Sequence, residues 1–120
     1  MKPKLLFTLA TIYMAIIGMI LQAAPIMAFG LAPDVPASLV AKLRVPASLF
    51  LAFAVLDWFA RNSEASSARN AIFIGNTVAF FIVGILDLLH PSGWVFAVIN
   101  LLFAIAFFVV GRANMSTGVS

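Results

Sequence analysis

The chain has 120 residues, of which 64% are apolar and only 9% are charged. A soluble domain of this size has about 45–50% apolar and about 25% charged residues, so this composition excludes a water-facing globular domain and, equally, a disordered chain. The absence of cysteine excludes thiol redox relays, thiolate metal sites and cysteine nucleophiles. An integral membrane protein is predicted, since four helical spans of about 20 residues each would use most of the chain.

Four apolar stretches are long enough to cross a membrane. The first follows Lys2 and Lys4 and exceeds the about 7–15 apolar residues of a signal peptide, so a retained helix is expected. Pro25 should loosen its outer end, and Gly30 should help to stop it. The predicted spans are residues 5–27, 37–60, 71–89 and 93–111.

Prolines and a polar loop punctuate the later spans. Pro46 lies inside the second span and is expected to kink it or to split off a short interfacial piece. The polar residues 61–70 form a loop with several candidate helix N-caps. Pro91 is expected to end the third span and Ser92 to cap the fourth. The predicted fold is all-α: a single transmembrane domain over residues 1–120, built as an up-down-up-down four-helix bundle.

The basic residues predict the orientation of this bundle. With four spans, one side carries five of them, and the other side carries only Lys42 and Arg44. Cytoplasmic loops are enriched in Lys and Arg, so both termini are expected in the cytoplasm. Because the net charge of +3 is scattered and not clustered, no nucleic-acid partner is expected. The five residues on the basic side are Lys2, Lys4, Arg61, Arg69 and Arg112.

Small and polar residues form a stripe along the first span. They recur at spacings of three and four, which places them on a single helical face. Such a stripe is typical of a helix-packing seam, where small side chains let two backbones approach, and it could equally form the wall of a pocket. The stripe consists of Thr8, Thr11, Ala15, Gly18 and Gln22.

Polar residues within membrane spans are costly and therefore informative. Five polar residues, with aromatic rings between them, are expected to line the bundle interior: Gln22, Arg44, Asn76, Asp87 and Asn100.

Within that interior, Arg44 and Asp87 are the opposite charges that could meet in the outer part of the bundle, with Gln22 or His90 nearby. Such a pair would either fix the register of the second and third spans or form the polar end of a pocket for a head group or quinone-like ring. A third alternative is that both side chains extend separately to the interface. The ligand-binding candidates are Gln22, Arg44, Asp87, His90 and Asn100.

Asp57 and Arg61 are four residues apart near the end of the second span. This order of acid and base favours a local structural ion pair, with a proton-carrying carboxylate as the alternative for Asp57. His90 is the only histidine, and one imidazole without further ligands does not build a metal site. Since no nucleophile elbow, carboxylate pair or phosphate loop occurs either, no catalytic residue, metal or cofactor is expected.

The order of these features resembles a known family. The first span ends in Pro25 and a Phe-Gly-Leu segment at 29–31, and a Pro-rich turn with Leu43-Arg44 opens the second span. That span ends in Asp-Trp-Phe-Ala-Arg at 57–61, and a tight Pro-Gly turn joins the last two spans. This pattern is similar to the small four-helix membrane proteins of the DoxX-like group, which includes domains of unknown function. The resemblance implies a four-helix bundle in the cytoplasmic (inner) membrane of a bacterium. One branch of the group is linked to quinone-dependent sulfur oxidation, a reaction that no residue here fixes.

The expected function is non-enzymatic. The chain should be a multi-pass membrane protein that binds a lipophilic small molecule or acts as an accessory subunit of a membrane complex. Its expected partners are the lipid bilayer, such a molecule, and either further copies of itself or a larger complex. A quinone-linked redox subunit and a small oligomeric transporter are the alternatives. Small multidrug transporters depend on a glutamate in the first helix, and residues 5–29 contain no acidic side chain.

Overall fold

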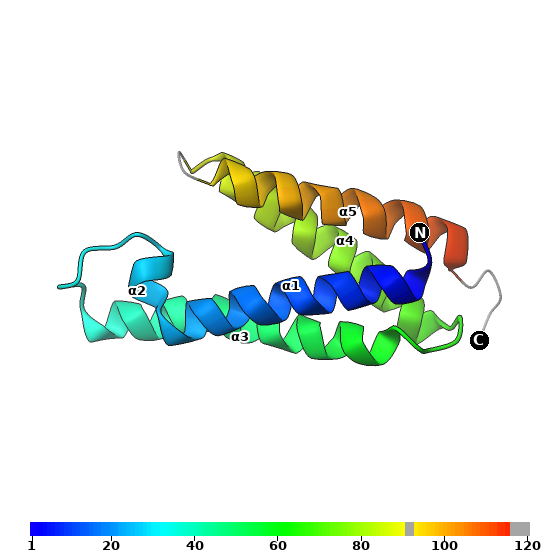
Figure 1. Cartoon of the computed structure of the whole chain (residues 1–120), viewed down its shortest axis with the longest axis horizontal. Coiled ribbons are helices and arrows are strands. Elements are labelled where there is room, and N and C mark those ends of the chain that lie inside the picture. The colour runs from blue at the N-terminus through cyan, green and yellow to red at the C-terminus, as the bar shows by residue number, and fades with distance from the viewer. Residues whose placement is uncertain (91–92, 116–120) are drawn as a thin grey trace. The chain divides into compact units, whose positions relative to one another are not determined.

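The computed structural model describes residues 1–90 and 93–115, so the roles predicted for Pro91 and Ser92 lie outside the described residues. All regular structure in these ranges is helical, which confirms the all-α class (Figure 1). Among the described residues, four helices are long and apolar enough to cross a membrane, as predicted for a multi-pass membrane protein. The helices are α1 (Pro3–Ala23), α2 (Pro25–Ala28), α3 (Ala37–Ala60), α4 (Ser67–Leu88) and α5 (Trp94–Asn114).

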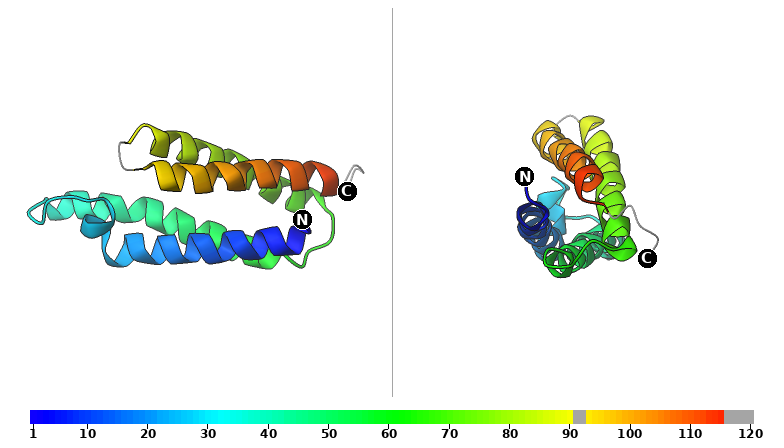
Figure 2. Two further views of the ribbon diagram at one scale, coloured as in Figure 1. Left: turned by 45° about the horizontal axis from the view of Figure 1, so that its top comes forward. Right: turned by 90° about the vertical axis from the view of Figure 1, so that its right-hand side faces the viewer.

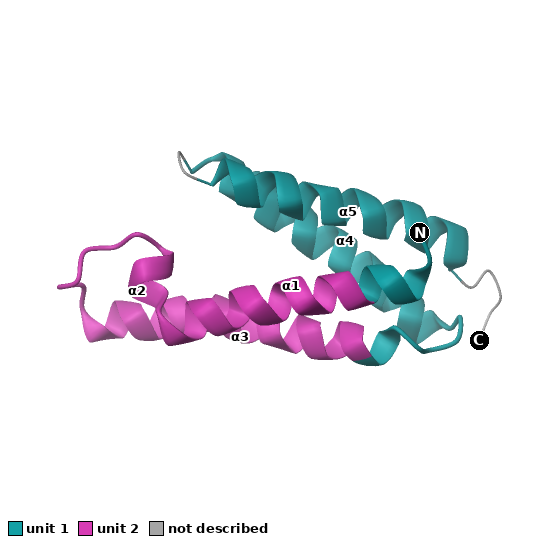
Figure 3. Ribbon diagram, viewed as in Figure 1, with its two compact units in different colours: residues 1–7, 59–120 teal, residues 8–58 magenta. Residues whose placement is uncertain are grey.

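The chain forms two compact units, which Figure 3 shows in different colours. Unit 1 contains residues 1–7 and 59–120, and unit 2 contains residues 8–58. Unit 1 therefore consists of α4 and α5 together with the first turns of α1 and the last residues of α3. The expectation of one domain over residues 1–120 stays a prediction.

In unit 2, α1 and α3 run antiparallel and side by side (Figures 1 and 2). The Thr11 hydroxyl donates a hydrogen bond to the Ala54 carbonyl at 3.3 Å. A Cβ added to Gly18 would lie 2.9 Å from the Leu51 side chain and 3.2 Å from the Ala47 carbonyl oxygen, so the backbones approach closely at this point. The small-residue stripe of α1 thus serves as a helix-packing seam at Thr11 and Gly18.

The first predicted span contains a break. Helix α1 ends at Ala23, and Ala24 adopts the non-helical angles φ −138° and ψ 58° ahead of Pro25. Proline has no N–H to continue the helical hydrogen bonds, but it suits the first position of the new helix α2. Gly30 has a φ of +63°, and hydrogen bonds from Gly30 to Met27 and from Leu31 to Ile26 close a Schellman motif. Gly30 therefore ends this segment, as predicted.

Helix α3 continues through Pro46 without interruption, so Pro46 does not split the span, and the kink that was the other expectation stays a prediction. Proline removes one backbone donor, and membrane helices tolerate this when other groups compensate. The Ser48 hydroxyl donates to the Arg44 carbonyl at 3.1 Å, a bond separate from the Lys42 carbonyl that loses its donor at Pro46.

Helix α4 begins four residues before the predicted start at residue 71. Ser66 is its N-cap, and the Ser66 hydroxyl accepts a hydrogen bond from the Arg69 amide at 3.2 Å. Three of the first four residues of α4, Ser67, Arg69 and Asn70, are polar, so hydropathy alone predicts a loop here. Helix formation here depends on the cap, which satisfies one of the amides that lack a helical partner.

Helices α4 and α5 form an antiparallel hairpin (Figure 2). A Cβ on Gly84 would lie 2.8 Å from the Leu101 side chain, and a Cβ on Gly93 would collide with the Asp87 carbonyl. Two glycines therefore permit the close helix contact and the tight connection. Phe80 of α4 stacks on Phe103 with ring centroids 4.9 Å apart, which adds an aromatic contact to the hairpin.

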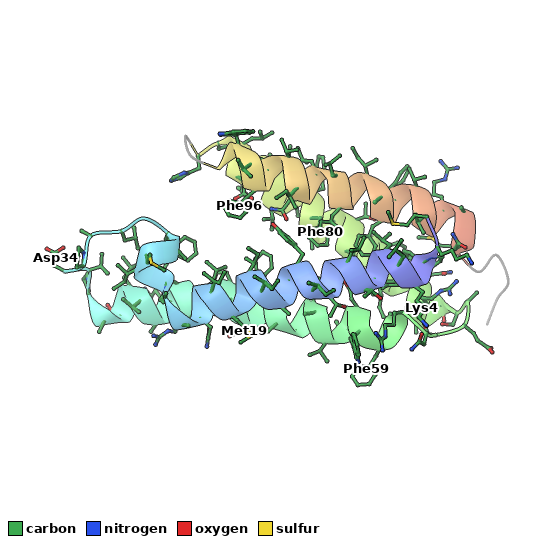
Figure 4. The ribbon with its side chains drawn as sticks, in the orientation of Figure 1. Lys4, Met19, Asp34, Phe59, Phe80 and Phe96 are labelled. Carbon is green, nitrogen blue, oxygen red and sulfur yellow. The ribbon has the colours of Figure 1, made fainter. Side chains whose placement is uncertain are left out.

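The outward faces of the helices are apolar. Phe59 is 74% exposed and Leu86 is 60% exposed, and Figure 4 shows Phe59 extending away from the ribbon. Exposed apolar side chains along every long helix suit a hydrocarbon environment, because lipid replaces the water that would oppose them.

Candidate functional site

Asp87 and Asn100 form the polar centre of the α4–α5 hairpin. The Asn100 side-chain amide (Nδ2) donates a hydrogen bond to Asp87 Oδ2 at 2.8 Å. Asn100 is only 2% exposed, whereas Asp87 is half-buried. A hydrogen bond to a carboxylate is stronger than one between neutral groups, so Asn100 anchors the acidic group at this position.

The local geometry of the hairpin explains why these two residues meet. Gly84 lies against Leu101, which brings the turn after Gly84 opposite the residue before Leu101. Because the next turn of α4 carries Asp87 and Asn100 precedes Leu101, their side chains come within hydrogen-bond distance.

His90 lies beside Asp87, just beyond the end of α4. Its amide donates to the Asp87 carbonyl at 3.1 Å, and its own carbonyl accepts from the Gly93 amide at 3.0 Å. The imidazole is exposed and interacts electrostatically with the Asp87 carboxylate. Asp87, His90 and Asn100 therefore form one polar group at the connected end of the hairpin.

An aromatic region begins one turn from this polar group. Phe103 follows Asn100 by three residues and stacks on Phe80, which Figure 4 labels. Phe80 also stacks on Phe107, with the ring centroids 5.8 Å apart. Asn76 is fully buried further along α4, and its amide donates to the Ile72 carbonyl at 3.1 Å. The hairpin thus has a polar end followed by an apolar aromatic body.

Gln22 and Arg44 come together in unit 2. Arg44 Nε donates to the backbone carbonyl of Gln22 at 3.1 Å, and both side chains are exposed. Gln22 lies in the last turn of α1, where carbonyl groups lack a helical partner and carry partial negative charge. Arg44 therefore acts as a cap on the C-terminal end of α1.

The five ligand-binding candidates thus fall into two groups. Asp87, His90 and Asn100 belong to unit 1, while Gln22 and Arg44 belong to unit 2. The approach of Arg44 to Asp87 stays a prediction. The partner that the sequence reasoning missed for Asp87 is Asn100, and pairing the third and fourth spans through their tight turn would have found it.

Asp57 is fully buried, at 0% exposure, although the sequence suggested an interfacial position for it. Arg61 follows one turn later, just past the end of α3, and is half-buried. Acidic side chains are almost never fully buried unless they are paired. The structure thus adds the burial of Asp57, and the Asp57–Arg61 ion pair stays a prediction.

Arg69 has a structural role that the sequence did not indicate. Its guanidinium donates to the Asn114 carbonyl at 2.8 Å and to the Ser63 carbonyl at 3.0 Å, and it lies 5.7 Å from the centroid of the Phe73 ring. It therefore caps the C-terminal end of α5 and holds the loop before α4. Arg44 and Arg69 act in the same way: each guanidinium donates to a backbone carbonyl at the C-terminal end of another helix.

The chemistry available at the polar group is binding, through a carboxylate acceptor, an amide and an imidazole. Across residues 1–90 and 93–115, no three His, Cys, Asp or Glu side chains are grouped so that they could hold a metal ion. Comparison with known proteins adds no relative: no family model, curated protein or solved structure matches the chain.

Proposed function

We propose that this protein is a small multi-pass protein of a bacterial inner membrane that binds a lipophilic molecule. Asp87, with Asn100 and His90, would hold the polar head of that molecule, and the aromatic hairpin would support its apolar part. The protein would act without catalysing a reaction, alone or as an accessory subunit of a membrane complex.

The bond between Asn100 and Asp87 carries this proposal. A charged side chain costs about 2.5–3.5 kcal/mol at the centre of a membrane helix and is by default a candidate for function; Asp87 lies near the end of α4, where the cost is lower. A carboxylate offers about four acceptor sites, of which the Asn100 amide occupies one. Since Asp87 is only half-buried, its carboxylate can also accept from a ligand head group that carries an O–H or N–H donor.

The orientation belongs to the same proposal. The ends that carry Lys2, Lys4, Arg61, Arg69 and Arg112 would face the cytoplasm, with the helices in up-down-up-down order. The Asp87 group would then lie toward the opposite face of the membrane. The similarity to the DoxX-like group supports the bacterial membrane and the four-helix arrangement, and it supplies no reaction.

Native mass spectrometry of the protein purified in mild detergent tests the binding function. We expect the wild type to retain a lipophilic molecule, and Asp87→Asn to retain at least about tenfold less, in line with the loss of a hydrogen bond to a charged group. Asp34→Asn is the matched control, because it makes the same chemical change at an exposed loop position.

The identity and stoichiometry of the retained species decide among the functions. A wild-type protein that carries no ligand contradicts the proposal, as does equal retention by the Asp87 and wild-type proteins. Retention of a quinone would support binding at this site and would favour the redox-subunit alternative over a simple binder.

A further inference from the structure

Three helix ends are held together in unit 1 by aromatic contacts. One phenylalanine from each helix is fully buried, and the three ring centroids lie 4.8, 5.5 and 6.2 Å apart. This cluster joins the first turns of α1, the beginning of α4 and the end of α5. Its members are Phe7, Phe73 and Phe107.

Each of the three helices carries a basic residue between its buried phenylalanine and the nearer end of the helix. Lys4 precedes its phenylalanine by three residues, Arg69 precedes its own by four, and Arg112 follows its own by five. At a rise of about 1.5 Å per residue, the Cα atoms of these basic residues lie about 4.5–7.5 Å further along their helices than those of the phenylalanines. Figure 4 shows Lys4 at the same end of unit 1 as the last turns of α5. We call Lys4, Arg69 and Arg112 the basic end.

Within the described residues, Arg69 and Arg112 both contact neutral groups. Arg69 donates to two neutral carbonyl groups, and the Arg112 guanidinium lies 5.7 Å from the centroid of the Phe108 ring. Glu64 is the acidic residue of the neighbouring loop, and Lys2 and Arg61 add further positive charge. Even when Asp57 and Glu64 are both counted against these basic residues, the formal charge around the basic end is positive.

Apolar side chains are exposed close to these cations. Leu5 on α1, Ile74 on α4 and Phe108 on α5 are each about half exposed, at 51%, 54% and 52%. A molecule that satisfies both features has a negatively charged head at the level of the cations and hydrocarbon chains along the helices. Basic residues at a membrane surface attract anionic lipids in this way.

We propose that the basic end binds the phosphate head group of an anionic phospholipid, whose acyl chains lie along the exposed apolar faces of unit 1. The proposal needs only that the protein resides in a membrane, and it does not depend on a ligand at Asp87. It is a lipid site, because the adjoining apolar surface would give no advantage to free phosphate.

Lipid binding can be measured by native mass spectrometry after the protein is mixed with phosphatidylglycerol or with phosphatidylcholine of the same acyl chains. We expect the wild type to bind the anionic lipid preferentially. Lys4→Gln should lower this preference about fivefold, the effect of one basic residue near a charged membrane surface, and the addition of Arg112→Gln should lower it further. Arg112→Lys, which keeps the charge, should retain the preference.

Lys42→Gln is the matched control, because it removes an exposed lysine from α3 in unit 2, and it should leave the preference unchanged. Circular dichroism checks that each variant keeps its helical content. Equal binding of the two lipids by the wild type, or an equal loss in Lys42→Gln, would overturn the proposal. Displacement of the lipid by excess inorganic phosphate would also overturn it, since that result would assign the site to free phosphate.

Discussion

The hydrogen bond between Asn100 and Asp87 makes a quantitative prediction about the stability of the hairpin. Replacing Asn100 with Leu removes the amide that donates to Asp87 Oδ2 at 2.8 Å and fills the space with an apolar side chain of similar size. Since Asn100 is 2% exposed, water does not enter the space of its side chain and can reach the carboxylate only from the exposed side of Asp87.

Two magnitudes bracket the expected loss. Hydrogen bonds to charged groups contribute about 1.5–3 kcal/mol in proteins, whereas hydrogen bonds between membrane helices average about 0.6 kcal/mol and reach about 1.7. Asp87 is charged but only half-buried, so part of the loss is recovered by hydration of the carboxylate. We therefore expect a coupling energy of about 1 kcal/mol between the two side chains, near the upper part of the membrane range.

A double-mutant cycle measures this coupling. The free energy of unfolding is determined in mixed micelles for the wild type, Asn100→Leu, Asp87→Leu and the double variant, with helicity as the signal. The cycle separates the pairwise contribution from the effect of each substitution alone. If the two losses add to within about 0.3 kcal/mol, which is the usual scatter for independent sites, the reasoning is refuted. Such a result would mean that Asn100 does not stabilise the Asp87 carboxylate.

Two further predictions concern unit 2. Gly18→Leu should lower the free energy of unfolding by about 1–3 kcal/mol, the usual cost of overpacking, because even a Cβ at Gly18 would lie 3.2 Å from the Ala47 carbonyl oxygen. Unfolding in mixed micelles measures this free energy. Met19→Leu, at an exposed neighbouring position, is the control and should change the free energy little. An unchanged stability of Gly18→Leu would contradict the close approach of α1 and α3. Arg44→Gln should cost about 0.3–1 kcal/mol through loss of the charge at the end of α1 and should speed amide hydrogen exchange in residues 20–24, whereas equal exchange in variant and wild type would show that Arg44 does not cap the helix.

The helical class and the long helices could be predicted from hydropathy alone. A membrane span must satisfy its backbone within the helix, so long apolar stretches leave few alternatives. The details that failed depend on single hydrogen bonds. The early start of α4 depends on the Ser66 hydroxyl, and the break at Ala24 depends on the missing donor of Pro25, which sequence reasoning placed only as a loosened helix end.

The candidate site was harder to predict because a sequence does not show which neutral side chains lie beside a charged one. The sequence predicts Arg44 as a partner of Asp87, which stays a prediction, and the structure adds the neutral amide of Asn100. Likewise, the sequence predicts Arg69 as a signal of membrane orientation and Arg44 as a partner of Asp87, and the structure adds that both donate to backbone carbonyls at helix ends. Side-chain composition does not reveal which backbone carbonyls lack a partner, since this depends on where each helix ends.

The short connection between α4 and α5 has a consequence for how the protein enters the membrane during synthesis. Only residues 89–93 separate the two helices, so we expect α4 and α5 to enter the membrane together. A lone α4 would bring the Asp87 carboxylate into lipid without its amide donor. Entry of both helices as one hairpin supplies Asn100 at the same step, which lowers the cost of inserting an acidic residue. The close approach that Gly93 permits would thus allow the Asp87–Asn100 hydrogen bond to form while the two helices insert.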